Sequence, residues 1–271
     1  MKERVYTFGE QGNLIGIITE SESSVPDDVG VILLNAGLVH RIGPFRMNVT
    51  LARSIAARTK HHVFRFDISG LGDSERLNTG VDRDEQIIGD IKQALDFFSR
   101  KTGQNKFIVI GLCTGADHAH KITVADERVT GAVLLDGYGY PTIKYYLNKY
   151  GKKILNPIKW FKKIKKITNS RNNTGAESGV ESYYWKLPPK DIFRNDLQSL
   201  INREVKMFYV YSGGVTDYFN YKEQLADSFK GMQLDKYIQF EYFPEADHTY
   251  SFSGHRDKLI GVILNWIEAR F

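Results

Sequence analysis

The sequence predicts an α/β fold in which helices cover both faces of a mostly parallel central sheet. Segments of strand length alternate with amphipathic helical segments along most of the chain, and this alternation is typical of parallel sheets. The strand segments are almost continuously apolar, as expected where a sheet is covered on both sides. With 271 residues and 42% hydrophobic content, the chain is long enough to bury a large core.

The first 138 residues contain most of the segments on which this prediction rests. Residues 5–8 and 13–20 read as short strands joined near Gly12, which favours an N-terminal hairpin. The helical segments that follow carry apolar residues three or four positions apart, such as Met47 and Leu51. We expect strands over 29–37, 62–70, 106–113 and 129–137, and helices over 45–59, 83–103 and 114–127.

Residues 139–204 interrupt the alternation, because they are rich in Tyr, Lys, Asn and Pro and predict short helices and loops. We interpret them as a basic, aromatic-rich cap inserted into a core made of residues 1–138 and 205–271. Such a cap would lie over the carboxyl edge of the sheet, where open α/β sheets bind ligands. The alternation resumes with expected strands over 205–214 and 237–248 and helices over 216–232 and 256–271.

The excess of positive over negative charge lies in this cap. The net charge is +5, yet residues 139–171 contain ten Lys or Arg and no Asp or Glu, so the remainder of the chain is net negative. Within this stretch the apolar residues Ile158, Phe161, Ile164 and Ile167 are spaced three apart and predict one apolar helix face. We expect a lid helix that packs over the site and keeps its lysines in solvent.

The basic cap also has alternative interpretations as a docking surface. It could bind an acidic partner, such as an acyl carrier protein or the phosphate groups of a CoA-linked substrate, or it could lie on an anionic membrane. Nucleic-acid binding is not expected, because no nucleic-acid module accompanies the charge.

Cysteine content and apolar runs bear on the compartment. Cys113 is the only cysteine, so no internal disulfide can form and nothing indicates an oxidising compartment. The N-terminal residues lack a signal-peptide pattern, and no apolar run reaches the length of a membrane span. We therefore expect a cytoplasmic protein without a transmembrane segment.

The pentapeptide Gly111-Leu112-Cys113-Thr114-Gly115 lies between an expected strand and an expected helix. It resembles the nucleophile elbow of α/β-hydrolases, G-x-S-x-G, with cysteine in place of serine. Flanking glycines leave room for the strained turn that such an elbow requires. The alternative is a glycine-bracketed strand end that holds a buried, unreactive cysteine.

A second segment extends this resemblance. Asp67, Gly70, Gly72 and Ser74 match the D-x-x-G-x-G-x-S segment of the α/β-hydrolase superfamily one by one. In that superfamily the segment shapes a turn near the site and is not catalytic. The resemblance covers essentially the whole chain and implies the α/β-hydrolase fold. "GLCTGAD" and the segment after residue 33 are similar to exosortase-associated hydrolases and related serine-aminopeptidase-like hydrolases.

In this superfamily the chain order is nucleophile, acid, then histidine, each after a strand. Asp217 follows the expected strand over 205–214, and His248 ends the expected strand over 237–248. We expect Asp217 to orient His248 and His248 to take the thiol proton of Cys113. Asp136, at the end of "VLLDG", is a rival acid, since some hydrolases place the acid after the equivalent strand. Asp247 is read as a loop carboxylate or a helper of His248.

The superfamily resemblance also implies an oxyanion hole made of main-chain N–H groups. Its donors would be Thr114 and one of Gly37 and Leu38, although Asn35-Ala36 replaces the usual His-Gly pair of this loop. His40 and Arg41 follow at once and could bind a substrate carboxylate, or could only stabilise the loop.

Cysteine at the elbow predicts acyl chemistry through a thioester intermediate. A helix N-terminus favours an anion, and a neighbouring histidine would stabilise the thiolate further. We expect a hydrolase acting on small acyl esters or thioesters with a Cys-His-Asp triad, without cofactor or metal. One alternative is an acyltransferase that passes the acyl group to an amine, thiol or hydroxyl. Another is a non-catalytic binding protein on a hydrolase fold.

Overall fold

The computed structural model describes residues 1–23, 27–77, 80–154 and 187–271, with only the backbone for 152–154. One sheet of eight strands runs through the molecule in the order β1-β2-β4-β3-β5-β6-β7-β8. Pairing is antiparallel for β1–β2 and β2–β4 and parallel for every other pair. The strands are β1 (Lys2–Phe8), β2 (Leu14–Glu20), β3 (Val29–Leu33), β4 (Val63–Asp67), β5 (Lys106–Leu112), β6 (Val129–Leu135), β7 (Lys206–Ser212) and β8 (Ile238–Phe243).

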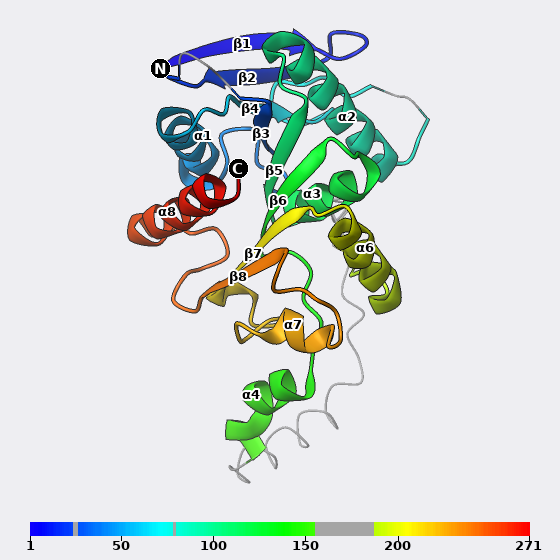
Figure 1. Ribbon diagram of the computed structural model, residues 1–271, viewed down its shortest axis with the longest axis vertical. Helices are drawn as coiled ribbons and strands as arrows, with labels where there is room; N and C mark the ends of the chain where they lie inside the picture. Colours follow the sequence, from blue (N-terminus) through cyan, green and yellow to red (C-terminus); the bar gives the residue numbers. More distant parts are fainter. Residues whose placement is uncertain (24–26, 78–79, 155–186) are drawn as a thin grey trace, which may run out of the picture.

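Helices cover both faces of this sheet, so the predicted fold class is confirmed (Figure 1). On one face, α1 (Met47–Arg58) and α8 (Ser253–Arg270) bury their apolar residues against β3–β7. The opposite face is covered by α2 (Arg83–Thr102), α3 (Thr114–Ala125) and α6 (Lys190–Asn202). The near-continuous apolar strands, with β4 buried along its whole length, therefore reflect burial on two sides.

Part of the stretch expected to form the cap packs into this layered body. Phe193 and Leu197 of α6 are fully buried in the same core as α2 and α3. By contrast, α4 (Ile143–Ile154) stands at one end of the molecule (Figure 1). It buries Tyr145 but leaves Ile143 and Leu147 exposed. The four apolar positions expected on the lid helix, Ile158, Phe161, Ile164 and Ile167, lie outside the described residues.

The helix expected over 216–232 is much shorter in the structure, where only α7 (Gln224–Ser228) is helical in that range apart from a preceding short turn. Two aromatic side chains explain the loss of its first two turns. Phe219 stacks on Tyr211 of β7 with ring centroids 3.5 Å apart, and Tyr218 turns inward to donate a hydrogen bond to the main-chain oxygen of Asp136. The Gln224 amide then bonds to the carbonyl oxygen of Tyr218, which fixes the loop.

The parallel strands β3 to β8 all end at one edge of the sheet. The loops that leave this edge hold Cys113 after β5, Asp136 after β6 and His248 after β8. Among the described residues, no helix is both long and apolar enough to cross a membrane.

Candidate active site

Cys113 lies in a strained turn between β5 and α3. Its φ of 58° and ψ of −121° are unusual for a residue with a side chain, and it directly precedes the first residue of α3. Its N–H donates to the carbonyl oxygen of Leu135, and its own carbonyl accepts from Ala116. The strand-turn-helix context expected for a nucleophile elbow is therefore present.

The two glycines of the pentapeptide allow close backbone packing at this turn. A Cβ on Gly111 would lie 2.0 Å from the carbonyl oxygen of Gly115. A Cβ on Gly115 would in turn lie 2.4 Å from the carbonyl oxygen of Asn35. Neither distance is tolerable, so glycine at both positions brings α3 against β5 and against the loop after β3.

His248 connects Cys113 to a buried carboxylate. Its Nδ1 lies 2.8 Å from Oδ2 of Asp136, whose side chain is fully buried. The hydrogen bonds to Asp136 and to Cys113 raise the pKa of His248 to about 10, against the opposing effect of burial. The structure thus brings together Cys113, His248 and Asp136.

Asp217, the acid favoured from the sequence, is not part of this cluster. Its side chain is 98% exposed, and its carboxylate lies 3.3 Å from Nζ of Lys149 on α4. The carboxylate that accepts from Nδ1 of His248 is that of Asp136, so the structure favours the rival acid over Asp217. The loop after β7 carries Asp217 outward, because Tyr218 and Phe219 occupy the inner positions beside it.

The end of β7 performs two other tasks. Ser212 donates both its N–H and its hydroxyl to the Asp136 carboxylate, at 2.6 and 2.7 Å. Gly214 lies against the backbone of His248, where a Cβ would come within 2.2 Å of its nitrogen. No motif in the sequence singles out Ser212 or Tyr218, although the "SGG" that ends this strand signals close backbone packing there.

The raised pKa of His248 predicts that the wild type and a His248 variant differ in stability by an amount that depends on pH. A folded-state pKa of about 10 against an unfolded value near 6.5 means that protonated His248 contributes stability below pH 6.5. This contribution is lost as the pH rises toward 10. We expect the difference in unfolding free energy between the wild type and His248→Gln to be larger at pH 6 than at pH 10. Urea titrations of both proteins at the two pH values measure it, and a difference that grows with pH would contradict the assignment.

The loop after β3 lies against the elbow, but one N–H group expected to be free for the oxyanion is already hydrogen-bonded. The N–H of Gly37 donates to the hydroxyl of Thr114 at 2.8 Å, so this predicted donor is already engaged. None of the described hydrogen bonds uses the N–H of Thr114 or of Leu38. The Leu38 side chain is 70% exposed.

The two residues proposed to bind a substrate carboxylate have different environments. His40 is exposed. Arg41 instead pairs with buried Asp67 and, at 2.6 Å, with Asp73, so its guanidinium is engaged within the protein. Since Asp67 also accepts from the Asn35 amide at 3.2 Å, this cluster fixes the loop after β3 to the end of β4. These contacts favour the second of the two roles expected for Arg41, which is to stabilise the loop.

The four residues matched to the D-x-x-G-x-G-x-S segment support the same cluster. The Ser74 hydroxyl donates to the carbonyl oxygen of Asp67 at 2.7 Å and accepts from the N–H of Ile15 at 2.9 Å. A Cβ on Gly72 would lie 2.2 Å from the Asp67 carboxylate. The segment thus forms a turn around Asp67.

We expect Arg41→Ala to lower the free energy of unfolding by about 2–4 kcal/mol, because it leaves the buried Asp67 carboxylate without its cation. Arg4→Ala is the matched control, since the Arg4–Glu20 pair is exposed and should contribute less than about 1 kcal/mol. Urea unfolding curves of the two variants test this. Equal losses would show that the Asp67 cluster does not stabilise the loop.

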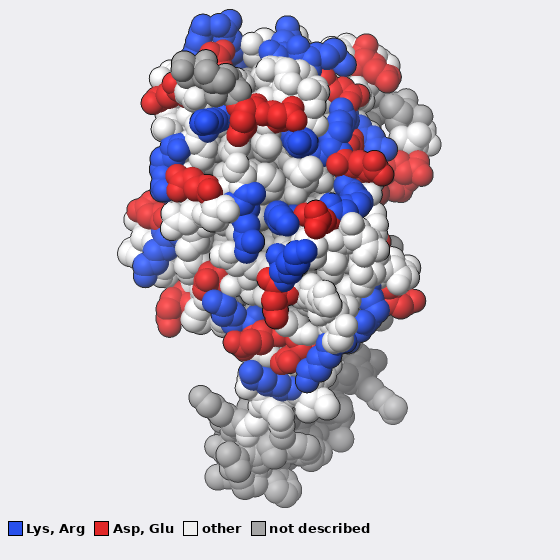
Figure 2. Space-filling model, in the orientation of Figure 1, with Lys and Arg blue, Asp and Glu red and all other residues white. Residues whose placement is uncertain are grey.

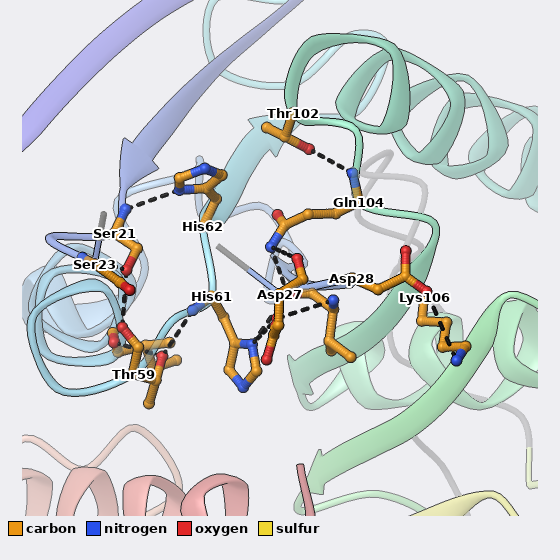
Figure 3. A network of polar contacts seen from close by, with 12 residues as sticks. Ser21, Ser23, Asp27, Asp28, Thr59, His61, His62, Thr102, Gln104 and Lys106 are labelled. Atoms are coloured by element: carbon orange, nitrogen blue, oxygen red, sulfur yellow. Dashed lines mark hydrogen bonds and ion pairs between the residues drawn. The ribbon is translucent and has the colours of Figure 1, made fainter. Parts of the chain in front are cut away.

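The other histidines are engaged elsewhere or lie apart from the elbow. His61 and His62 belong to a polar network at the opposite edge of the sheet, where His61 bonds to Asp27 and His62 accepts from the N–H of Ser21 (Figure 3). On α3, His120 bonds to Asp196 at 2.9 Å, and burial lowers the pKa of His118 to about 4.

Comparison with known proteins agrees with this architecture. The family profile described as "Hydrolase_4: Serine aminopeptidase, S33" matches residues 30–179, more than half of the chain. The chain belongs to this family. The match begins at β3 and includes the elbow and Asp136. The chain is an α/β-hydrolase, and the turn between its β5 and α3 carries Cys113. No curated protein matches the sequence.

Solved structures share the fold at low sequence identity. An α/β serine hydrolase without a lid from Xanthomonas campestris has a TM-score of 0.59 and 11% identity over 99% of this chain and 95% of that one. An α/β serine hydrolase homologue from Coxiella burnetii has a TM-score of 0.58 and 16% identity over 97% and 96%. Mouse α/β hydrolase domain-containing protein 10 has a TM-score of 0.56 and 15% identity over 99% of both chains.

Proposed function

We propose that the chain hydrolyses acyl thioesters and esters with Cys113 as nucleophile, His248 as proton carrier and Asp136 as the acid that orients His248. The observation that carries the proposal is the hydrogen-bonded series from Cys113 through His248 to buried Asp136. A nucleophile beside a base that a third group orients is the general arrangement of covalent acyl transfer.

Asp136 would fix His248 through Nδ1, which leaves Nε2 for the sulfur and the substrate. The raised pKa of His248 favours the imidazolium, which would stabilise a Cys113 thiolate. Attack forms a bond between sulfur and the acyl carbon, and the leaving thiolate or alkoxide takes the proton of His248. Neutral His248 then deprotonates a water molecule, which attacks the thioester and restores the Cys113 thiolate and the imidazolium.

The nucleophile favours thioesters and activated esters over amides. In the tetrahedral intermediate from an amide, the amine must take the proton of His248 before it can leave, and until then the Cys113 thiolate is the better leaving group. In the intermediate from a thioester, two thiolates compete on similar terms and the reaction proceeds. Water is the acceptor that the hydrolase family implies, while the same thioester could acylate an amine or a thiol.

The basic cap is the part of the chain proposed to hold an acyl carrier protein or a CoA phosphate. Of the ten cations in residues 139–171, two have described ion pairs. Both turn toward the body, since Lys144 lies 3.5 Å from Glu223 and Lys149 lies 3.3 Å from Asp217. Docking would therefore rely on the basic residues of 152–171. Over the coloured part of the face shown in Figure 2, blue and red side chains are interspersed. His40 remains a candidate contact for a substrate carboxylate. We place the enzyme in the cytoplasm, where the Cys113 thiol would stay reduced.

The test is to incubate the enzyme with a model acyl thioester, with and without a primary amine, and to quantify free acid and amide. We expect free acid as the main product, and loss of turnover in Cys113→Ala. An excess of amide would favour the acyltransferase, and turnover unchanged by Cys113→Ala would reject Cys113 as the nucleophile.

A further inference from the structure

The hydroxyl of Thr114 lies between the elbow and the loop after β3. Thr114 directly follows Cys113, is only 7% exposed, and accepts the N–H of Gly37 on Oγ1 at 2.8 Å. Gly37 carries one of the two amides that the family resemblance offers as the second oxyanion donor, and its N–H points at this oxygen in the resting protein. A substrate oxygen would meet the hydroxyl where it would otherwise meet the amide.

The Thr114 hydroxyl keeps one proton to donate. A hydroxyl that accepts from an N–H can still donate its own proton, and no hydrogen bond among the described residues uses the proton of Thr114. As Thr114 is the first residue of α3, no preceding helical carbonyl is available to its hydroxyl. The donor is buried and has no described acceptor.

The loop that holds Gly37 is fixed in place. The Asn35 amide donates to Asp67, and Arg41 pairs with the same carboxylate, so both ends of the 35–41 segment are bound to the end of β4. The direction of the Gly37 N–H, and with it the orientation of the Thr114 hydroxyl, is thereby set before any substrate binds. Fixed donors of this kind stabilise developing charge without reorganisation.

We infer that the Thr114 hydroxyl is a catalytic hydrogen-bond donor to the oxyanion, oriented by the N–H of Gly37 and acting together with the main-chain N–H of Thr114. The inference rests on the proposed function. As the bond between Cys113 sulfur and the acyl carbon forms, the carbonyl electron pair moves onto oxygen and accepts from the Thr114 hydroxyl. The hydroxyl keeps its proton, and the pair returns when the bond to the leaving group breaks.

The test compares Thr114→Val with Thr114→Ser, because valine keeps the shape of threonine and serine keeps the hydroxyl. We expect Thr114→Val to lower the rate of acylation by a model thioester about 10²-fold, the effect of losing one oxyanion donor, with the fall mainly in kcat. Thr114→Ser should retain most of the wild-type rate. Alkylation of Cys113 by iodoacetamide forms no oxyanion, so it should proceed at similar rates in all three proteins.

The opposite result would overturn the inference. Valine cannot accept from Gly37, so if the amide of Gly37 is the true donor, Thr114→Val releases it and acylation stays the same or becomes faster. Parallel losses of acylation and alkylation would mean that Thr114 only shapes the elbow. Absence of acylation in the wild type would instead reject the proposed function itself.

Discussion

Asp136→Asn should lower kcat/KM for thioester hydrolysis by about 10³–10⁴-fold, the loss seen when an orienting carboxylate of this kind becomes an amide. The Asp136 carboxylate accepts from His248 at 2.8 Å and from the hydroxyl and N–H of Ser212. To keep the bond from the Ser212 N–H, asparagine must place its oxygen at the Oδ1 position, so its NH₂ group faces Nδ1 of His248 and the Ser212 hydroxyl. That exchange turns the imidazole into the wrong tautomer for proton transfer at Nε2. Steady-state assays with a chromogenic thioester measure the effect.

Asp217→Asn is the matched control, because the same change is made in the acid that strand order alone favours. Its side chain is almost fully exposed, and among the described residues its carboxylate pairs only with Lys149. We expect its kcat/KM to stay within about twofold of the wild type, as for other exposed positions. A large loss in Asp217→Asn together with a small one in Asp136→Asn would reverse the assignment of the acid.

Cys113→Ala should abolish turnover, with a loss of at least about 10⁴-fold, since no acyl-enzyme can form without the sulfur. Cys113→Ser separates nucleophile identity from site geometry. A serine hydroxyl must be deprotonated by neutral His248 during attack, whereas the wild-type site favours the imidazolium. We therefore expect weak esterase activity from the serine variant and little thioester turnover. Wild-type activity in Cys113→Ala would mean that another group attacks the substrate.

The fold could be predicted from local patterns because the strands of a doubly covered sheet are short apolar runs and the helices between them are amphipathic. The helix expected from residue 216 was wrong for a physical reason that no local pattern contains. Its first turns would place Tyr218 and Phe219 on a helix face. Instead, the Phe219 ring stacks on Tyr211 and the Tyr218 hydroxyl donates to the main-chain oxygen of Asp136. Long-range burial outweighed helix propensity there.

Local patterns likewise predict one part of the candidate site, and contacts between distant residues decide the rest. That Cys113 and His248 lie together could be predicted, because a strand, a glycine-bracketed turn and chain order restrict each to a single position. Which carboxylate joins them could not, because Asp136 and Asp217 both follow a strand that ends at the correct edge. The choice depends on which side chain turns inward, and that is decided by Ser212 and the glycines beside it. The roles of Arg41 and Gly37 likewise depend on partners more than 20 residues away.

The most direct test of the central claim is the mass of the protein after brief exposure to an acyl thioester and acid quenching. If Cys113 attacks the acyl carbon, intact-protein mass spectrometry should show one added acyl group. Peptide mapping should then place it on the peptide that contains Cys113, in the wild type and not in Cys113→Ala. Hydroxylamine should remove the group, as expected for a thioester. An unmodified protein that nevertheless consumes the thioester, or an acyl group on another residue, would contradict the account.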